Sequence, residues 1–462
     1  MNLKRILLTR AKASRFLSAF LRHLGSGSWD LPIAVRGFLL SAFCFLLFSS
    51  AFGQDYQVPT DVFVAPEQAS QQALDQSLSR TSLRFWGLDL FPYATANSFY
   101  DDNILISHTR PISDVHWIFA PGLTVTAGDI ATTVPGSVTL AQVRDLTYYS
   151  LMGDSSRPQR FVGVNYTPGF NFYTENPQYN YIDQVENLSA GYNFSRLALG
   201  LDQDYAYQHV KDNGVGDLVA IAQFDTKLRG RYELSDRSSV EANLKYYWLT
   251  YPGEPYQGYQ EVRNEDWFNR LLGARLEVGL GAAFGFAFPQ SSPNQTYQDA
   301  LLRGVYHVSG KLDLRASLGL ELREYASDQA NSLTPVFSIS AAYQPRASTT
   351  IGLEAHRNQQ PSYDSDYNYQ TTGFNAGVRQ QLSGALSAGL TGGYDYVQYL
   401  YTSSGPGNDR VDNLLWVKVS LNYEFSRHLT SSLYYTLQQD DSSLERYTYI
   451  DNMVGIQVDW RY

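Results

Sequence analysis

The segment Met453–Tyr462 reads M-V-G-I-Q-V-D-W-R-Y and alternates between two kinds of side chain. Apolar and aromatic residues stand at every second position (Val454, Ile456, Val458, Trp460 and Tyr462), and small or polar residues lie between them (Gly455, Gln457, Asp459 and Arg461). Successive side chains of a β-strand point to opposite faces, so the alternation predicts a strand with one apolar and one hydrated face. The edge of a soluble β-sandwich and the wall of a membrane β-barrel both use such strands.

This segment, with its final aromatic residue, resembles the closing strand of bacterial outer-membrane β-barrels. The resemblance implies that Val458, Trp460 and Tyr462 belong to the signal that the outer-membrane assembly machinery recognises. We therefore favour a membrane barrel and keep the soluble edge strand as the alternative.

The same two-residue period recurs along the chain, most clearly in Lys311–Tyr325. One face there carries Leu312, Leu314, Ala316, Leu318, Leu320 and Leu322, and the other carries Lys311, Asp313, Arg315, Ser317, Gly319, Glu321 and Arg323. The charged face must meet water. The leucine face must meet lipid, unless a second apolar sheet covers it.

Short turns separate the periodic segments and alternate with longer polar loops. The turns fall at 194–196, 234–237, 309–311, 344–346, 382–384 and 425–427, with a weaker one near Gly279–Gly281, and the loops include 251–266, 359–366 and 402–412. This asymmetry is typical of bacterial barrels. The pattern predicts an all-β fold, a transmembrane antiparallel up-and-down β-barrel of about 18 strands (roughly 16–18) with both termini periplasmic. Ile130–Pro158 departs from the pattern, as a periplasmic excursion or an inward plug.

The first residues have the features of an export signal. Seven basic residues and a single acidic one, Asp30, lie within residues 1–36, ahead of an apolar run at Phe38–Phe48 and the small residues Ala51 and Gly53. We predict a signal peptide over 1–53, a flexible periplasmic segment over 54–82 and the barrel over 83–462. An uncleaved membrane anchor is the alternative for the first segment. The only cysteine, Cys44, lies in the leader, so the mature chain would have no disulfide.

Removing residues 1–53 makes the chain strongly acidic. It leaves 28 basic residues (35 minus 7) and 44 acidic ones (45 minus 1), a net charge of −16. A chain of this charge lacks the basic face that nucleic-acid binding requires. All 35 tyrosines follow the leader, and nothing after it approaches 18 consecutive apolar residues, so the mature sequence predicts no spanning helix.

Several short motifs are similar to those of the β-barrel porin 2 family of outer-membrane proteins. They are Tyr100-Asp101-Asp102-Asn103-Ile104, Pro121-Gly122-Leu123, Gly128-Asp129, Asn165-Tyr166, Tyr173 and the turn Phe194-Ser195-Arg196. The similarity runs from about Trp86 to the C-terminus, with 130–158 as a departure. It implies an integral protein of the cell outer membrane with porin activity, and an association with exopolysaccharide export. No catalytic residues come with it.

The residues offer no specific catalytic or metal site. Asp101, Asp102 and Asn103 have oxygen ligands of the kind that calcium prefers, but these residue types also favour strand-end loops, and we favour the loop. The histidines lack the paired spacing of a metal site (His108, His116, His209, His307, His356 and His428). The glycines Gly279, Gly281 and Gly285 look strand-like rather than phosphate-binding. We therefore predict no enzyme, no cofactor and no metal.

The function that we predict is passive passage of small polar solutes through a porin-like pore. The predicted pore-lining residues carry both signs of charge: Asp225, Lys227, Arg229, Arg231, Arg275, Glu277, Asp313, Arg315, Glu321 and Arg323. Mixed charge across a channel favours polar over apolar solutes. Alternatively, these charges pair with one another and stiffen the wall.

Two other functions remain open at this point. The barrel could be a conduit for secreted polysaccharide, or a closed structural or adhesion barrel whose outer loops are the working surface. The expected partners are outer-membrane lipid, the assembly machinery and either small polar solutes or polysaccharide. The oligomeric state is left open.

Overall fold

The structure, a computed structural model, describes residues 83–128, 160–309, 311–326, 331–364, 367–401 and 410–462. All of them belong to one compact unit, Ala51–Tyr462. The predicted signal peptide, the segment 54–82 and the stretch Ile130–Pro158 lie outside the described residues, as does most of the loop 402–412.

The described chain is built from β-strands. Their bounds are β1 Leu83–Phe85, β2 Leu88–Asp101, β3 Asp114–Gly128, β4 Arg160–Tyr173, β5 Tyr181–Asn193, β6 Leu197–Asp212, β7 Asp217–Ser235, β8 Ser238–Thr250, β9 Tyr259–Leu271, β10 Leu276–Pro289, β11 Gln295–Ser309, β12 Leu312–Tyr325, β13 Ser332–Arg346, β14 Thr349–Pro361, β15 Tyr367–Gln381, β16 Leu386–Tyr401, β17 Arg410–Ser426, β18 Leu429–Ser442 and β19 Tyr449–Arg461. Two 3₁₀ turns, η1 (Pro177–Tyr179) and η2 (Glu445–Tyr447), complete the elements. No helix among these residues is long and apolar enough to cross a membrane.

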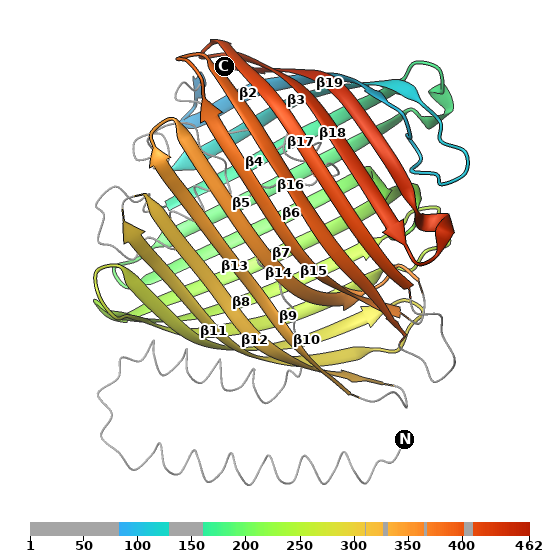
Figure 1. The fold of residues 1–462 in the computed structure, drawn as a ribbon. Helices are drawn as coiled ribbons and strands as arrows, with labels where there is room; N and C mark the ends of the chain where they lie inside the picture. Colours follow the sequence, from blue (N-terminus) through green and yellow to red (C-terminus); the bar gives the residue numbers. More distant parts are fainter. Residues whose placement is uncertain (1–82, 129–159, 310, 327–330, 365–366, 402–409) are drawn as a thin grey trace, which may run out of the picture. The chain divides into compact units, whose positions relative to one another are not determined.

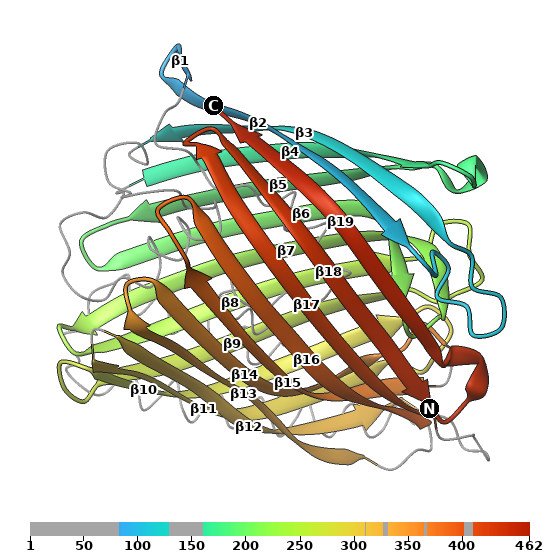
Figure 2. The same cartoon turned by 45° about the horizontal axis from the view of Figure 1, so that its top comes forward.

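The strands close into a single antiparallel barrel. Each strand from β2 to β19 pairs with its sequence neighbours, and β19 pairs with β2, so that Trp460 lies opposite Ala94. Figures 1 and 2 show the strands wrapping round in sequence order, with β19 beside β2. The short strand β1 pairs with the start of β2. The barrel wall in the described part of the chain is therefore 18 strands, β2 to β19, as predicted.

The two ends of the barrel differ. At the end that carries Tyr462, which we call the turn end, described connections such as 194–196, 236–237 and 427–428 are very short. At the other end, the loop end, the connections 102–113, 251–258 and 443–448 are longer. The six stronger predicted turns all lie within about three residues of turn-end connections, because turn residues and breaks in alternation are local signals.

The weaker predicted turn near Gly279–Gly281 is wrong. The connection lies at 272–275, and both glycines lie inside β10. They are required by close packing rather than by a turn, because a Cβ at Gly281 would come within 2.6 Å of the Trp267 ring and one at Gly279 within 2.5 Å of Asn269. Glycine inside a strand often marks such a close approach, which sequence alone does not separate from a turn.

The wall has an apolar outer face and a polar inner face. On β12, Leu318 and Leu320 are about half exposed (45% and 52%), whereas Glu321 and Arg323 are buried. The same division holds on β19, where Val454 and Ile456 are exposed and Asp451 is buried. A closed sheet leaves no second described sheet to cover the leucines, so this outer surface is suited to lipid. The soluble edge-strand alternative does not fit this surface.

An arginine on the outer face should destabilise the barrel, and one on the inner face should not. Leu433 and Ser432 are adjacent on β18; Leu433 is 56% exposed on the outer face, and Ser432 faces inward. We expect Leu433→Arg to lower the free energy of unfolding in lipid vesicles by about 2–4 kcal/mol if it lies near the bilayer midplane. Ser432→Arg should change it little. Equal unfolding curves for the two variants would mean that the faces of β18 are assigned the wrong way round.

Candidate functional site

The hairpin of β6 and β7 is longer than the strands on either side of it. The two strands pair with each other up to Asp212 and Asp217. In contrast, the ladder from β5 ends at Tyr207, and the ladder to β8 begins at Ala222. Residues 208–221, which we call the tip hairpin, therefore project beyond the wall strands that flank them. A tight turn ends the tip, with Gly216 at φ +76° and its N–H donating to the Asp212 carbonyl at 2.6 Å.

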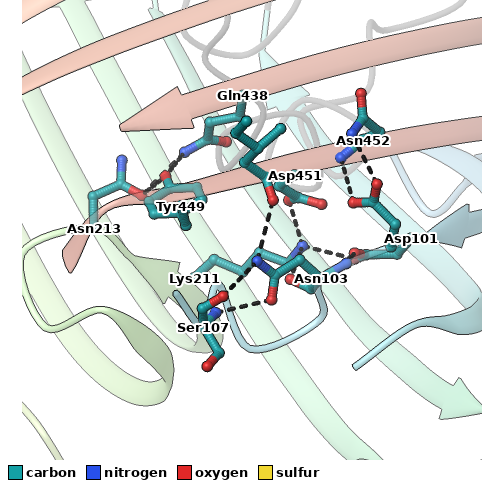
Figure 3. Close-up of polar contacts among 11 residues, drawn as sticks. Asp101, Asn103, Ser107, Lys211, Asn213, Gln438, Tyr449, Asp451 and Asn452 are labelled. Carbon is teal, nitrogen blue, oxygen red and sulfur yellow. Dashed lines mark hydrogen bonds and ion pairs between the residues drawn. The ribbon is translucent and has the colours of Figure 1, made fainter. Parts of the chain in front are cut away.

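The tip hairpin contacts strands that are not its neighbours in the wall. The side-chain oxygen of Asn213 accepts hydrogen bonds from Gln438 on β18, at 3.0 Å, and from the Tyr449 hydroxyl on β19. Figure 3 shows the three side chains together. The strands β2 to β5 lie between β6 and β19 in the sheet. The tip therefore makes these contacts across the inside of the barrel rather than along its wall.

Arg410, the first residue of β17, holds the turn of the tip hairpin. Its guanidinium donates to the carbonyl oxygens of Gly214 at 2.6 Å and Asn213 at 3.0 Å. Its remaining bonds go to Asp412, at 2.9 Å, and to the Tyr363 hydroxyl, at 2.9 Å. The planar guanidinium has five N–H donors in a fixed arrangement, so Arg410 can bind backbone carbonyls and a carboxylate at the same time. Arg410 therefore holds the turn of the tip hairpin in place.

Lys211 binds the side of the tip hairpin to β2 and β19, the two strands whose pairing closes the barrel. Its ammonium lies 2.7 Å from an oxygen of Asp101 on β2 and 2.6 Å from one of Asp451 on β19, and 3.2 Å from the Asn103 carbonyl (Figure 3). The Asn103 side chain bonds Ser107 and the Ile450 carbonyl. The three residues that accept from the Lys211 ammonium are all buried, so these hydrogen bonds are stronger than those of an exposed ion pair.

The contacts of Asp101 and Asp102 bear on the calcium site that the sequence offered as an alternative to a loop. Asp101, Asp102 and Asp451 come close enough together to hold a metal ion. However, the Lys211 ammonium binds two of the three, and Asp102 accepts from the backbone and side chain of Asn452 at 2.7 and 2.8 Å. These contacts favour the loop interpretation, in which Lys211 balances the charge.

The other side of the tip hairpin packs on tyrosines. Val215, Val219 and Tyr251 form a buried apolar cluster, against which Tyr256 and Tyr363 pack. Burial raises the pKa of the Tyr251 and Tyr363 hydroxyls, so both remain neutral at ordinary pH. Tyr251 can then donate to Asp212 at 3.1 Å, at the base of the turn. The polar contacts of Lys211 and Arg410 on one side and apolar packing on the other hold the tip hairpin inside the barrel.

Most of the predicted pore-lining residues lie on strands that present them to the interior. Asp225, Lys227, Arg229 and Arg231 alternate with outward residues on β7; Glu277 faces inward on β10; and Asp313, Arg315, Glu321 and Arg323 share one face of β12. Arg275 is a correction: it lies in the turn before β10, exposed, and donates to the Val308 carbonyl at 3.1 Å. The misplaced turn caused this error.

Several of these charges pair across neighbouring strands. Arg231 lies 2.9 Å from Glu241 of β8, which Arg303 of β11 also approaches to 2.7 Å. Arg323 lies 2.7 Å from Glu321. These are the pairs that the wall-stiffening alternative requires. The partners Glu241 and Arg303 were missed because alternation identifies the face of a residue but not its cross-strand neighbour.

Lys211, Asn213 and Arg410 were not among the residues predicted from the sequence. The structure alone shows the strand lengths: β7 has 19 residues and β6 has 16, against 13 in β5 and β8 on either side. The part of this hairpin that the sequence could have shown is its short turn, which contains Gly214 and Gly216.

The fold and surface define an integral outer-membrane β-barrel, with an apolar exterior, a polar interior and its own hairpin folded across the loop end. No family model matches the chain, and no curated protein matches it either. The resemblance to the β-barrel porin 2 family therefore stays a prediction.

Among solved structures, the chain is similar to outer-membrane barrels. The outer-membrane protein OpdK of Pseudomonas aeruginosa is 12% identical with a TM-score of 0.39, covering 81% of this chain and 98% of OpdK. OccAB4 of Acinetobacter baumannii is 9% identical with a TM-score of 0.41, covering 83% and 100%. The siderophore receptor PirA of Pseudomonas aeruginosa is 9% identical with a TM-score of 0.38, covering 81% and 80%. Such distant matches assign no substrate to this chain.

Proposed function

We propose that the protein is an outer-membrane channel for passive passage of small polar solutes, and that the tip hairpin narrows its loop-end mouth. The observation that carries this proposal is the hairpin itself, which crosses a barrel of 18 strands. Barrels with 16–18 strands enclose an aqueous lumen unless inserted segments fill it. An inserted hairpin converts a wide bore into a selective one.

The inner wall supports passage of polar rather than apolar solutes. Acidic and basic side chains lie side by side on it, as at Asp225 and Lys227, 3.1 Å apart. Opposite charges on a lumen wall set up fields that attract polar solutes, while paired charges also stiffen the wall. The polysaccharide conduit is less well supported, because Arg410 and Lys211 hold the hairpin where a polymer would pass.

We further propose that the turn end faces the periplasm. The short connections and Tyr462 share this end, and bacterial barrels place short turns in the periplasm and long loops outside. The tip hairpin would then guard the outer mouth.

Removal of the tip hairpin tests the proposed channel. Tyr207 and Ala222 are directly paired, so a two-residue Asn-Gly turn can join them in place of residues 208–221 and keep the wall ladder intact. We expect single-channel conductance in planar bilayers to rise several-fold, because strand number then sets the bore. The control is Arg275→Ala. Arg275 lies in the exposed turn-end connection between β9 and β10, so this variant should conduct like the wild type.

The outcomes separate the three functions. A steady current in the wild type and a larger one without the tip support the channel. Silence of both proteins would instead favour the closed structural barrel. A wild type that is silent until a polysaccharide is added would favour the conduit.

A further inference from the structure

The short strand β1 and the start of β2 form a small hairpin at the turn end, which we call the β1 hairpin (residues 83–90; Figure 2). Its two-residue turn is Trp86-Gly87, between the paired residues Phe85 and Leu88. Both turn residues have positive φ, 51° at Trp86 and 84° at Gly87. Asn-Gly is the preferred sequence for such a turn, whereas a bulky residue with positive φ is strained. The presence of Trp86 there therefore needs an explanation outside the turn itself.

The β1 hairpin exposes a tryptophan together with other apolar side chains. Trp86 is 91% exposed, and its ring stacks on that of Phe85 with the ring centres 4.9 Å apart. Leu83, Phe85 and Leu88 are exposed as well. An exposed group of large apolar side chains marks a surface that binds a membrane or a protein.

The apolar face of the β1 hairpin continues the lipid-facing side of the wall. Leu83 pairs with Leu90 and Phe85 with Leu88, so these four side chains share one face. On β2 this face alternates with the buried side chain of Asp89, which points inward, and it is therefore the outer face. The hairpin thus extends, at the turn end, the surface that the barrel presents to lipid.

The β1 hairpin also completes the edge of β2. The strand β19 runs beside β2 as far as the end of the chain, where the Tyr462 N–H donates to the Pro92 carbonyl at 3.1 Å. Because β3 occupies the other edge, β1 pairs with this same edge of β2, from Leu88 to Leu90. Backbone N–H and C=O groups left unpaired are costly beside lipid, so a strand that covers them suits a position at the membrane boundary.

We propose that the β1 hairpin binds the phospholipid surface, with Trp86 and Phe85 in the headgroup region of the leaflet at the turn end. Tryptophan suits this region because its ring is apolar and its indole N–H can donate to a polar group. Phospholipid is the partner because the apolar face of the hairpin is continuous with the lipid-facing wall. The inference goes beyond the proposed channel, since this contact lies outside the 18-stranded wall and needs no open lumen.

The test locates Trp86 in lipid vesicles that contain the whole protein. Subtracting the fluorescence of Trp86→Phe from that of the wild type leaves the signal of Trp86. Phosphatidylcholine brominated near the top of its acyl chains quenches from the lipid, and iodide quenches from water. We expect the brominated lipid to quench Trp86 about as strongly as Trp117, whose signal is obtained in the same way with Trp117→Phe, because Trp117 is exposed on the outer face of β3. Iodide should quench Trp86 several-fold less than free tryptophan.

Each result supports or overturns the proposal. Quenching by the brominated lipid supports the contact. Quenching by iodide alone would place Trp86 in water and overturn it, and quenching by neither would mean that protein covers the ring, which overturns it as well.

A second measurement applies if Trp86→Phe does not fold. A spin label on Leu88→Cys, in a Cys44→Ser chain, should relax faster with oxygen, which concentrates in lipid. Faster relaxation with a water-soluble nickel complex alone would overturn the proposal. Neither measurement needs a current, so failure of this contact and failure of the proposed channel are observed separately.

Discussion

Trp460→Ala combined with Tyr462→Ala should leave most of the protein outside the membrane, as unassembled chains in the periplasm. Both side chains point outward and are partly exposed, at 41% and 39%. The backbone of the strand, by contrast, is fully engaged: the N–H of Tyr462 donates to the Pro92 carbonyl at 3.1 Å and that of Arg461 to His428 at 2.9 Å. Alanine keeps these N–H groups, so the seam between β19 and β2 can still pair.

Loss of assembly in this variant would therefore point to recognition of the aromatic side chains rather than to a weakened seam. The measurement is the fraction of chains with heat-modifiable mobility that extract with the membrane. The control is Asp459→Ala combined with Arg461→Ala, which alters the inward face of the same strand and should assemble normally. A normal yield of membrane-extracted barrel from the aromatic variant would rule out the proposal that Trp460 and Tyr462 belong to the assembly signal.

Glu241→Ala should lower the free energy of unfolding by about 3–5 kcal/mol, the usual cost of breaking a buried ion pair by removing one partner. Glu241 accepts hydrogen bonds from Arg231 at 2.9 Å, Arg303 at 2.7 Å and Asn269 at 2.9 Å. Removing it leaves two cations together on the inner wall without their shared anion. Reversible urea unfolding in lipid vesicles would measure the change.

The control for this prediction is Asp313→Ala, on the same kind of inward face. The Asp313 side chain is 48% exposed and its ion-pair partner His307 is 47% exposed. Solvent screens such a pair, so the expected change is about 0–1 kcal/mol. If Glu241→Ala unfolded at the same urea concentration as Asp313→Ala, the buried pairs would not be what stiffens the wall.

Alternation and turn residues were enough to predict the architecture. Faces assigned from a two-residue period, such as Leu318 outward and Glu321 inward, agree with the exposure of these side chains. Both signals are local, because the geometry of a strand alone decides which way consecutive side chains point. The error at Gly279 arose where a residue serves a distant partner, since the Arg303 side chain occupies the space that its Cβ would need.

The sequence by itself therefore determined that the chain forms a barrel of about 18 strands, and which face of strands such as β12, β18 and β19 meets lipid. Only the tertiary structure decided what lies inside. Lys211 meets Asp101 across 110 residues and Asp451 across 240, and Arg410 meets Gly214 across 196. Such contacts depend on closure of the barrel and on how far one hairpin outruns its neighbours. The two-residue period of a strand carries no information on barrel closure or on how far a hairpin extends, because both depend on the pairing of all the strands together.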